Sequence, residues 1–91
     1  NNTITPQKIK KYHELTSKAL IIAKKSIVKG KEKQAKEIIE MVECYLSDSE
    51  HFKKNKNFVD SYGALNYAHG WLDSGARLKI FKVTDNKLFT I

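Results

Sequence analysis

The side chains with the richest chemistry are concentrated in one short stretch, residues 66–77. Arg77 is the only arginine beside sixteen lysines, and its planar guanidinium suits a carboxylate or a phosphate better than an ammonium does. Asp73 and Arg77 also have the spacing of an ion pair along one helix face. Two interpretations of Arg77 stay open: an anion anchor, and a salt-bridge cluster with Asp73 and Glu37 that fixes helix register. The candidate interaction or anion-binding residues are Asn66, Tyr67, His69, Trp71, Asp73 and Arg77.

The aromatic residues of this region favour the core and its edge. Trp71 shares its stretch with apolar residues such as Leu72 and Leu78, so we expect it to be buried. Tyr62 and Tyr67 cannot both face one core at a spacing of five residues. One of them should lie at an edge, where a tyrosine suits a protein interface.

Two carboxylate and imidazole pairs have the spacing that helix bundles use for metal centres. Asp48 and His51 are three residues apart. His69 and Asp73 are four residues apart. If their helices are antiparallel, the second pair lies ~9 to 15 Å beyond the first, at 1.5 Å per residue. The two pairs then cannot share an ion, so we predict no metal site.

We predict no catalytic residues. Cys44 has an acid four residues away on each side, Glu40 and Asp48, and nearby carboxylates disfavour the reactive thiolate. The sequence offers no plausible set of serine, histidine and aspartate and no glycine-rich phosphate loop. We therefore expect no cofactor and no enzymatic activity.

The formal net charge of +7 is unevenly distributed. Residues 1–36 carry ten lysines and two glutamates, whereas residues 37–52 carry five acids and no lysine or arginine. Lysine acts as a point charge and not as a planar fork. The basic surface is therefore compatible with nucleic acid and equally with a bias of composition. The candidate phosphate-facing residues are Lys8, Lys11, Lys18 and Lys25.

Local signals predict three helices. Thr5 and Pro6 are typical of a helix start, and Gly30 is typical of a helix end. Asn57 followed by Asp60 resembles a capping box at the start of the last helix. Apolar residues recur at helical spacing between these signals. The predicted helices span about residues 6–29, 31–53 and 58–81.

These elements predict an all-α fold, an up-down-up three-helix bundle with a short extended C-terminal tail, in a single domain over residues 1–91. The connections are too short for anything but antiparallel neighbours. The tail, residues 82–91, should be extended or form a small hairpin. Because an isolated hairpin is marginally stable, Leu88 and Phe89 should pack on the bundle or on another chain.

Two further expectations concern packing. Matching the levels of antiparallel helices places Asp48 opposite Tyr12 and His13, one of which should donate a hydrogen bond to the carboxylate. The third predicted helix is rich in glycine and alanine, and glycine is costly inside a helix. The small residues therefore indicate either close approach of a neighbouring helix or room for a ligand or partner.

Composition also bears on the compartment. No apolar run approaches the ~20 residues of a membrane helix, and the first residues lack the zones of a signal peptide. Cys44 is the only cysteine, so no internal disulfide and no cysteine-based zinc site can form. We expect a cytoplasmic protein with no membrane partner.

Five short motifs in the second half of the chain form a recognisable set. They read YLSD, FV, ALNYA, GWLD and GARL, at residues 45–48, 58–59, 64–68, 70–73 and 75–78. The set resembles the signature of a family of short archaeal domains of unknown function, and the resemblance covers about residues 6–91. It implies a three-helix up-and-down bundle in archaeal cytoplasm, with no established activity and no catalytic residue to carry over.

Three hypotheses of function follow. The leading one is a small protein-interaction module that presents a face of the third helix or the C-terminal tail to a protein partner or, as a homo-oligomer, to a second copy. The alternative is a lysine-rich domain associated with nucleic acid. The third is a small-ligand binder near Trp71 and Arg77.

Overall fold

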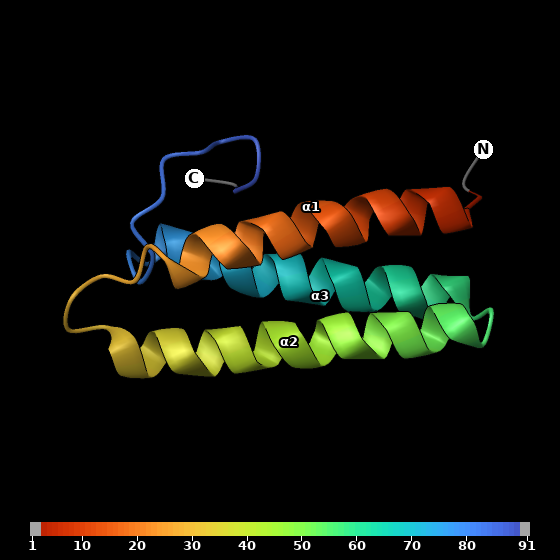
Figure 1. Ribbon diagram of the computed structural model, residues 1–91, viewed down its shortest axis with the longest axis horizontal. Helices are drawn as coiled ribbons and strands as arrows, with labels where there is room; N and C mark the ends of the chain where they lie inside the picture. The colour runs from red at the N-terminus through yellow and green to blue at the C-terminus, as the bar shows by residue number, and fades with distance from the viewer. Residues whose placement is uncertain (1–2, 90–91) are drawn as a thin grey trace.

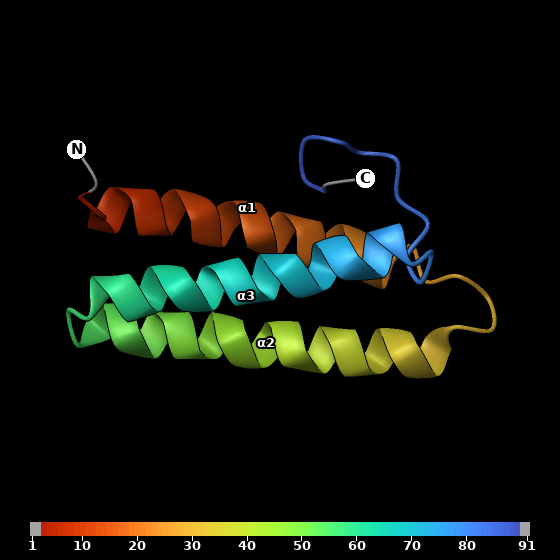
Figure 2. The ribbon, with the colours of Figure 1, turned by 180° about the vertical axis from the view of Figure 1, so that it is seen from behind.

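The computed structural model describes residues 3–89, which form three antiparallel α-helices followed by a non-helical tail (Figure 1). The helices are α1 (Pro6–Lys24), α2 (Glu32–Lys54) and α3 (Phe58–Arg77). They make an elongated bundle of 41 × 22 × 16 Å in which α3 packs most extensively on α2 (Figures 1 and 2). The predicted all-α three-helix fold is confirmed. Among residues 3–89, no helix is long and apolar enough to cross a membrane.

Local capping signals set two helix starts as predicted. The Thr5 hydroxyl accepts a hydrogen bond from the Lys8 amide at 3.2 Å, and Pro6 lies in the first turn of α1. The side-chain oxygen of Asn57 accepts from the Asp60 amide at 3.4 Å, and its side-chain amide donates to the Asp60 carboxylate at 2.6 Å. The bounds of α2 lie within one residue of the prediction.

The end of α1 differs from the prediction: the helix stops at Lys24 and not near residue 29. Ile27 forms an isolated antiparallel bridge with the segment that follows α3, and the Val28 amide donates to the Ile80 carbonyl oxygen at 2.9 Å. These β-branched residues suit extended backbone, and the bridge replaces hydrogen bonds that a longer helix would make. Gly30, with a φ of 92°, lies in the turn before α2 and is not the helix cap.

The end of α3 also differs, because the chain turns back at Arg77 and does not continue to residue 81. Lys79 adopts a left-handed conformation with a φ of 63°, and the Phe81 amide donates to the Gly75 carbonyl oxygen at 3.3 Å. The turn brings the Phe81 ring over Gly75, where an added Cβ atom would lie 2.5 Å from Cε2 of the ring. The absence of a side chain at Gly75 therefore makes room for Phe81 of the same chain.

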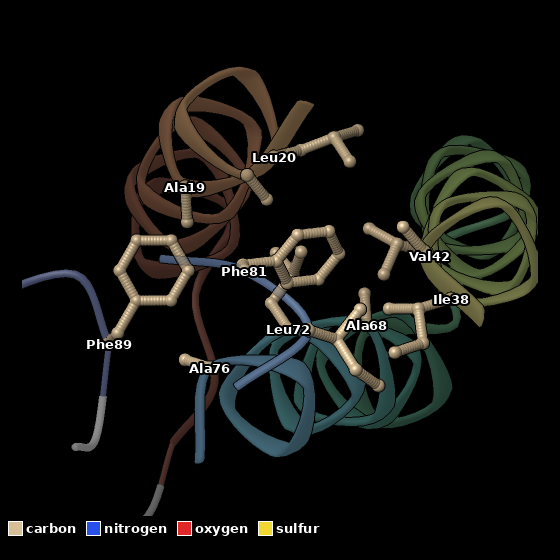
Figure 3. Packing of buried hydrophobic residues seen from close by; sticks show 12 residues of the cluster. Ala19, Leu20, Ile38, Val42, Ala68, Leu72, Ala76, Phe81 and Phe89 are labelled. Carbon is tan, nitrogen blue, oxygen red and sulfur yellow. The ribbon is translucent and has the colours of Figure 1, made fainter. Parts of the chain in front are cut away.

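Phe81 occupies the centre of the core (Figure 3). Its ring lies among Leu20 of α1, Val42 of α2 and Leu72 of α3. All four side chains are more than nine-tenths buried. One aromatic ring from beyond the last helix thus joins all three helices.

Small hydroxyl side chains hold α2 and α3 together near the turn that connects them. Ser49 and Ser61 are fully buried, and each hydroxyl donates to the backbone carbonyl oxygen of the other residue, at 2.9 and 2.8 Å. Because these reciprocal hydrogen bonds require one alignment of the two helices, they fix which residues of α2 lie beside which residues of α3.

The tail folds back onto its own bundle. Asp85 closes a turn, with its carboxylate accepting from the Leu88 amide and its carbonyl oxygen accepting from the Phe89 amide, both at 3.2 Å. Phe89 is buried beside Ala19 of α1 and Ala76 of α3 (Figure 3). Leu88 and Phe89 therefore pack on their own bundle, and of the two predicted forms of the tail, extended or a small hairpin, the hairpin is not formed within residues 82–89. The last two residues of the predicted tail lie outside the described residues.

Candidate functional site

The six candidate residues on α3 do not form one site, because they lie on different sides of the helix. Asn66 and His69 contact α1 or the tail, and Asn66 also lines a hollow with Tyr67 and Trp71. Tyr67 and Trp71 lie on the side of α2. We describe the α1 side first, then Arg77, and then the α2 side.

Asn66 is engaged by α1. The Tyr12 hydroxyl donates a hydrogen bond to Oδ1 of Asn66 at 2.9 Å, and the Tyr12 ring lies 5.2 Å from that of Tyr62 and 5.8 Å from that of His69. Burial raises the pKa of Tyr12 above its ordinary value, and the neighbouring Tyr62 and Asp73 raise it further. The side-chain oxygen of Asn66 thus takes part in an internal helix contact.

The predicted hydrogen bond to Asp48 is not formed. The Tyr12 hydroxyl bonds to α3 instead, and Nε2 of His13 lies 3.3 Å from Oε1 of Glu50. Asp48 is exposed because Ser49 occupies the buried side of α2 at this level. The prediction of a partner for Asp48 on α1 is therefore wrong.

His69 connects α3 to both α1 and the tail. Its Nε2 lies 2.7 Å from the Leu88 carbonyl oxygen and 3.8 Å from Oδ1 of Asp73, and its Nδ1 lies 3.0 Å from the hydroxyl of the buried Thr16. Because a carbonyl oxygen can only accept, Nε2 carries a proton, and in the neutral ring Thr16 donates to Nδ1. Both ring nitrogens are thus used to hold the tail against the bundle.

Arg77 is exposed and separate from Trp71. It lines a hollow with Phe81 and the start of the tail, whereas Trp71 lines another hollow beside α2. Within residues 3–89 no carboxylate oxygen lies within 4.0 Å of its guanidinium, so the predicted salt-bridge cluster with Asp73 and Glu37 is not formed. Asp73 lies beside the His69 ring instead.

Trp71 lies at the surface, and the prediction that it is buried is wrong. Its side chain is 39% exposed, because Leu72 takes the core position and adjacent residues point ~100° apart around a helix. Trp71 lines a hollow of about 510 Å³ between α2 and the end of α3. The residues around this hollow are Gln34, Glu37, Ile38, Glu40, Met41, Trp71, Leu78 and Ile80.

Exposed apolar surface continues from this hollow along α3. Tyr67 is 65% exposed, and its ring stacks on Tyr45 of α2 at a centroid distance of 5.3 Å and an angle of 21°. Gly70 borders a second hollow of about 310 Å³, and a Cβ atom added there would meet no heavy atom within 4 Å. We call the combined surface the Trp71 face. It consists of Ile38, Met41, Tyr45, Tyr67, Gly70, Trp71 and Leu78.

The Trp71 face was only partly predictable as a site. The exposure of Tyr67 confirms that one of the two tyrosines lies at an edge, and Tyr62 is half-buried. Leu78, 68% exposed, was not identified as a site residue, and neither was Met41. The signal for Leu78 was its spacing, because residues 67, 71 and 78 are separated by four and seven positions and so share one side of a helix.

Three exposed carboxylates of α2 have no basic partner, and two of them, Glu37 and Glu40, line the hollow of the Trp71 face. Glu37, Glu40 and Asp48 are exposed, and no lysine, arginine or histidine in the described part of the chain lies within 4.0 Å of their oxygens. Glu43, by contrast, forms an ion pair with Lys24 of α1 at 3.0 Å. We call Glu37, Glu40 and Asp48 the acidic ridge.

The four predicted phosphate-facing lysines are exposed, three on one side of α1 and Lys25 at its C-terminal cap. Their spacings of three, seven and seven residues keep them within ~100° of the helix circumference. In residues 3–89, no carboxylate oxygen lies within 4.0 Å of any of these ammonium groups. We call this set the lysine stripe. It consists of Lys8, Lys11, Lys18 and Lys25.

Metal-binding side chains are dispersed over the described chain. His69 and Asp73 lie close together, but both nitrogens of the histidine are occupied by internal contacts. Across residues 3–89, no three histidine, cysteine, aspartate or glutamate side chains gather so that they could hold a metal ion. Cys44 is exposed on α2.

Comparisons with known proteins identify a family without assigning an activity. Residues 11–81 match the model of a family described as "Protein of unknown function (DUF357)". Neither the comparison with curated proteins nor the comparison with solved structures found a match. The matched segment contains α2 and α3 completely and most of α1, so it includes the Trp71 face and the acidic ridge. The chain therefore belongs to the DUF357 family of proteins of unknown function.

Proposed function

We propose that this domain is a non-enzymatic protein-interaction module that binds its partner through the Trp71 face. The observation that carries the proposal is the exposure of three large side chains: Tyr67 and Trp71 on one side of α3, and Leu78 at its C-terminal cap. Apolar surface is unfavourable in water, and tyrosine and tryptophan are enriched where proteins meet. A continuous strip of such side chains indicates a surface that another protein covers.

The tail is a less suitable binding surface than the Trp71 face. Phe89 is only 2% exposed, and the Leu88 carbonyl oxygen accepts a hydrogen bond from His69. A partner that bound the tail would first have to displace both contacts. The burial of the tail therefore favours α3 and α2 as the elements that meet a partner.

Photo-cross-linking from position 78 tests this proposal. A photoreactive benzoylphenylalanine in place of Leu78 should yield a cross-linked partner in an extract of the source organism. The matched control carries the same group in place of Val59, which is 70% exposed near the start of α3 but lies outside the Trp71 face. Equal products from both positions, or no product from position 78, would contradict the proposal.

Association with nucleic acid is the second candidate function, and the lysine stripe supports it. Lysines contact phosphates without reading bases, so binding would have little sequence preference and would weaken as salt neutralises the phosphates. If all four lysines of the stripe contact duplex DNA, the log-log slope of affinity against salt should be about −3.6. Absence of binding at low salt would exclude this function.

A small ligand held jointly by Trp71 and Arg77 gains no support. The two side chains line different hollows, one beside α2 and one beside the tail. A ligand in either hollow would therefore use only one of the two residues.

The same proposal places the domain in the cytoplasm of an archaeon and gives it no catalytic role. The motifs at residues 64–78 resemble those of archaeal domains, and the single exposed thiol of Cys44 suits a reducing compartment. The absence of a catalytic role is supported by His69, both of whose ring nitrogens bond within the chain.

A further inference from the structure

We propose that the segment bound by the Trp71 face is an amphipathic α-helix with lysine or arginine along the edge that meets α2. This inference rests on the proposed function and names the chemistry of the partner. Three properties of the Trp71 face support the inference. Its shape suits a helix, its edge is acidic, and a second copy of the chain fits it poorly.

The shape of the Trp71 face suits a helix. Its two walls are the antiparallel helices α2 and α3, with the Trp71 side chain between Tyr67 and Leu78 along α3. These last two residues are eleven positions apart, or ~16 Å, which corresponds to about three turns of a docked helix. A bound strand would need unpaired backbone groups on the domain, and helix interiors have none. A helix forms its backbone hydrogen bonds internally. It would place one apolar stripe in the groove between α2 and α3, which the Trp71 face lines.

The charge of the acidic ridge determines the polar edge of the bound helix. Glu37 and Glu40 line the groove between α2 and α3, and Asp48 lies three residues, or ~4.5 Å along the helix, beyond Tyr45 at the end of the groove. Their carboxylates have no basic partner within 4.0 Å in residues 3–89. Cations on the bound helix would supply those partners, and a cation is also attracted to the exposed face of the Trp71 ring.

A second copy of this chain is a poorer occupant than another protein. Its basic helix, α1, has two exposed large apolar residues, Leu15 and Ile21. They are six positions apart, so their side chains point ~120° from one another around the helix and do not form a stripe. The lysines of α1 could meet the acidic ridge, but no apolar row would enter the groove.

Selection from displayed peptides tests the inference. The probe is a phage library of ~18-residue peptides on an alanine-rich helical scaffold, ~27 Å long, with randomised surface positions. Trp71 is the only tryptophan in the chain, so the change of its fluorescence reports whether a selected peptide covers the groove. Selected peptides should carry an apolar stripe flanked by lysine or arginine.

Neutralising the acidic ridge should then weaken the selected peptides. The double variant Glu37→Gln/Glu40→Gln should lower their affinity about tenfold, because two charge pairs at the edge of the groove are lost. The control Glu14→Lys changes the net charge by the same two units on α1, away from the groove, and should leave the affinity unchanged.

Three outcomes would overturn the inference: no enrichment of peptides, enrichment of peptides without a basic edge, or equal affinity for the neutralised variant and the control. A dimer in sedimentation that Leu78→Ser converts to a monomer would also overturn it, since the occupant would be a second copy. If position 78 still cross-links to another protein in these cases, the interaction module stands and only the class of segment is wrong.

Discussion

The two sides of α3 carry different chemistry and use it differently. On the side of α1, the side-chain oxygen of Asn66 and both ring nitrogens of His69 bond to Tyr12, Thr16 and the tail, within the chain. On the side of α2, large apolar side chains remain exposed beside carboxylates without partners. The polar groups of Asn66 and His69 thus serve internal contacts, whereas Cys44 and Arg77 are exposed. The proposed binding surface is therefore identified by the exposure of its side chains and not by their reactivity.

The largest loss of stability is expected when Phe81, the ring that contacts all three helices, is removed. Phe81→Ala should lower the free energy of unfolding by about 3 to 5 kcal/mol, because it leaves a cavity at the centre of the core. Urea denaturation measures the loss. The exposed Val59→Ala is the control and should stay within about 0.5 kcal/mol of the parent. A loss below 1 kcal/mol on removal of Phe81 would contradict the assignment of this ring to the core.

The second-largest loss of stability is expected on the side of α3 that faces α1. His69→Ala should cost about 2 to 3 kcal/mol, because the buried Thr16 hydroxyl and the Leu88 carbonyl oxygen lose their partner. Amide hydrogen exchange of Leu88 and Phe89 should accelerate in the variant, since the tail is released from the bundle. His51→Ala removes an exposed histidine and is the matched control. Unchanged exchange in the tail would show that His69 does not hold it.

Alkaline pH should weaken the contact between α1 and α3 through Tyr12. Burial raises the pKa of Tyr12 in the folded state, so as pH rises above about 10 the unfolded chain loses this proton first. Stability is therefore retained below pH 10 and falls as pH rises through the folded pKa. Urea unfolding over an alkaline pH series should show a shallower fall for Tyr12→Phe than for the parent. Identical slopes would mean that Tyr12 does not contribute.

The α2 side should contribute least to stability. The double variant Tyr67→Ser/Leu78→Ser should lower the free energy of unfolding by about 1 kcal/mol or less, mainly through the lost stacking on Tyr45. Circular dichroism should show unchanged helix content. A loss of unfolding free energy as large as that of His69→Ala would contradict the difference between the two sides of α3. The Trp71 face would then contribute to folding and not mainly to binding.

Local signals in the sequence were sufficient for the helices whose ends are set by near neighbours. The pairs Thr5 with Pro6 and Asn57 with Asp60 place two starts correctly, because capping acts over three residues. The late ends of α1 and α3 were wrong because residues 27–28 pair with residues 80–81, more than fifty positions away. A pairing between residues so far apart in the sequence does not change the spacing of apolar residues in either segment.

The candidate site was harder to predict than the fold. Periodicity shows that Trp71 and Leu72 point in different directions, but both are apolar, and the position of α2 decides which one is buried. The exposure of Asp48 depends in the same way on the contact between Ser49 and Ser61. These outcomes follow from how two helices are aligned, which a single sequence does not reveal.

The most direct test of the account compares binding with stability in one pair of variants. The partner cross-linked from position 78 is titrated with the Tyr67→Ser/Leu78→Ser variant and with the Val59→Ser control, and the unfolding free energy of each variant is measured under the same conditions. The account predicts at least a tenfold loss of affinity for the double variant alone, of the order expected for central interface residues, with both variants folded. Full affinity in the double variant would contradict the Trp71 face as the binding surface.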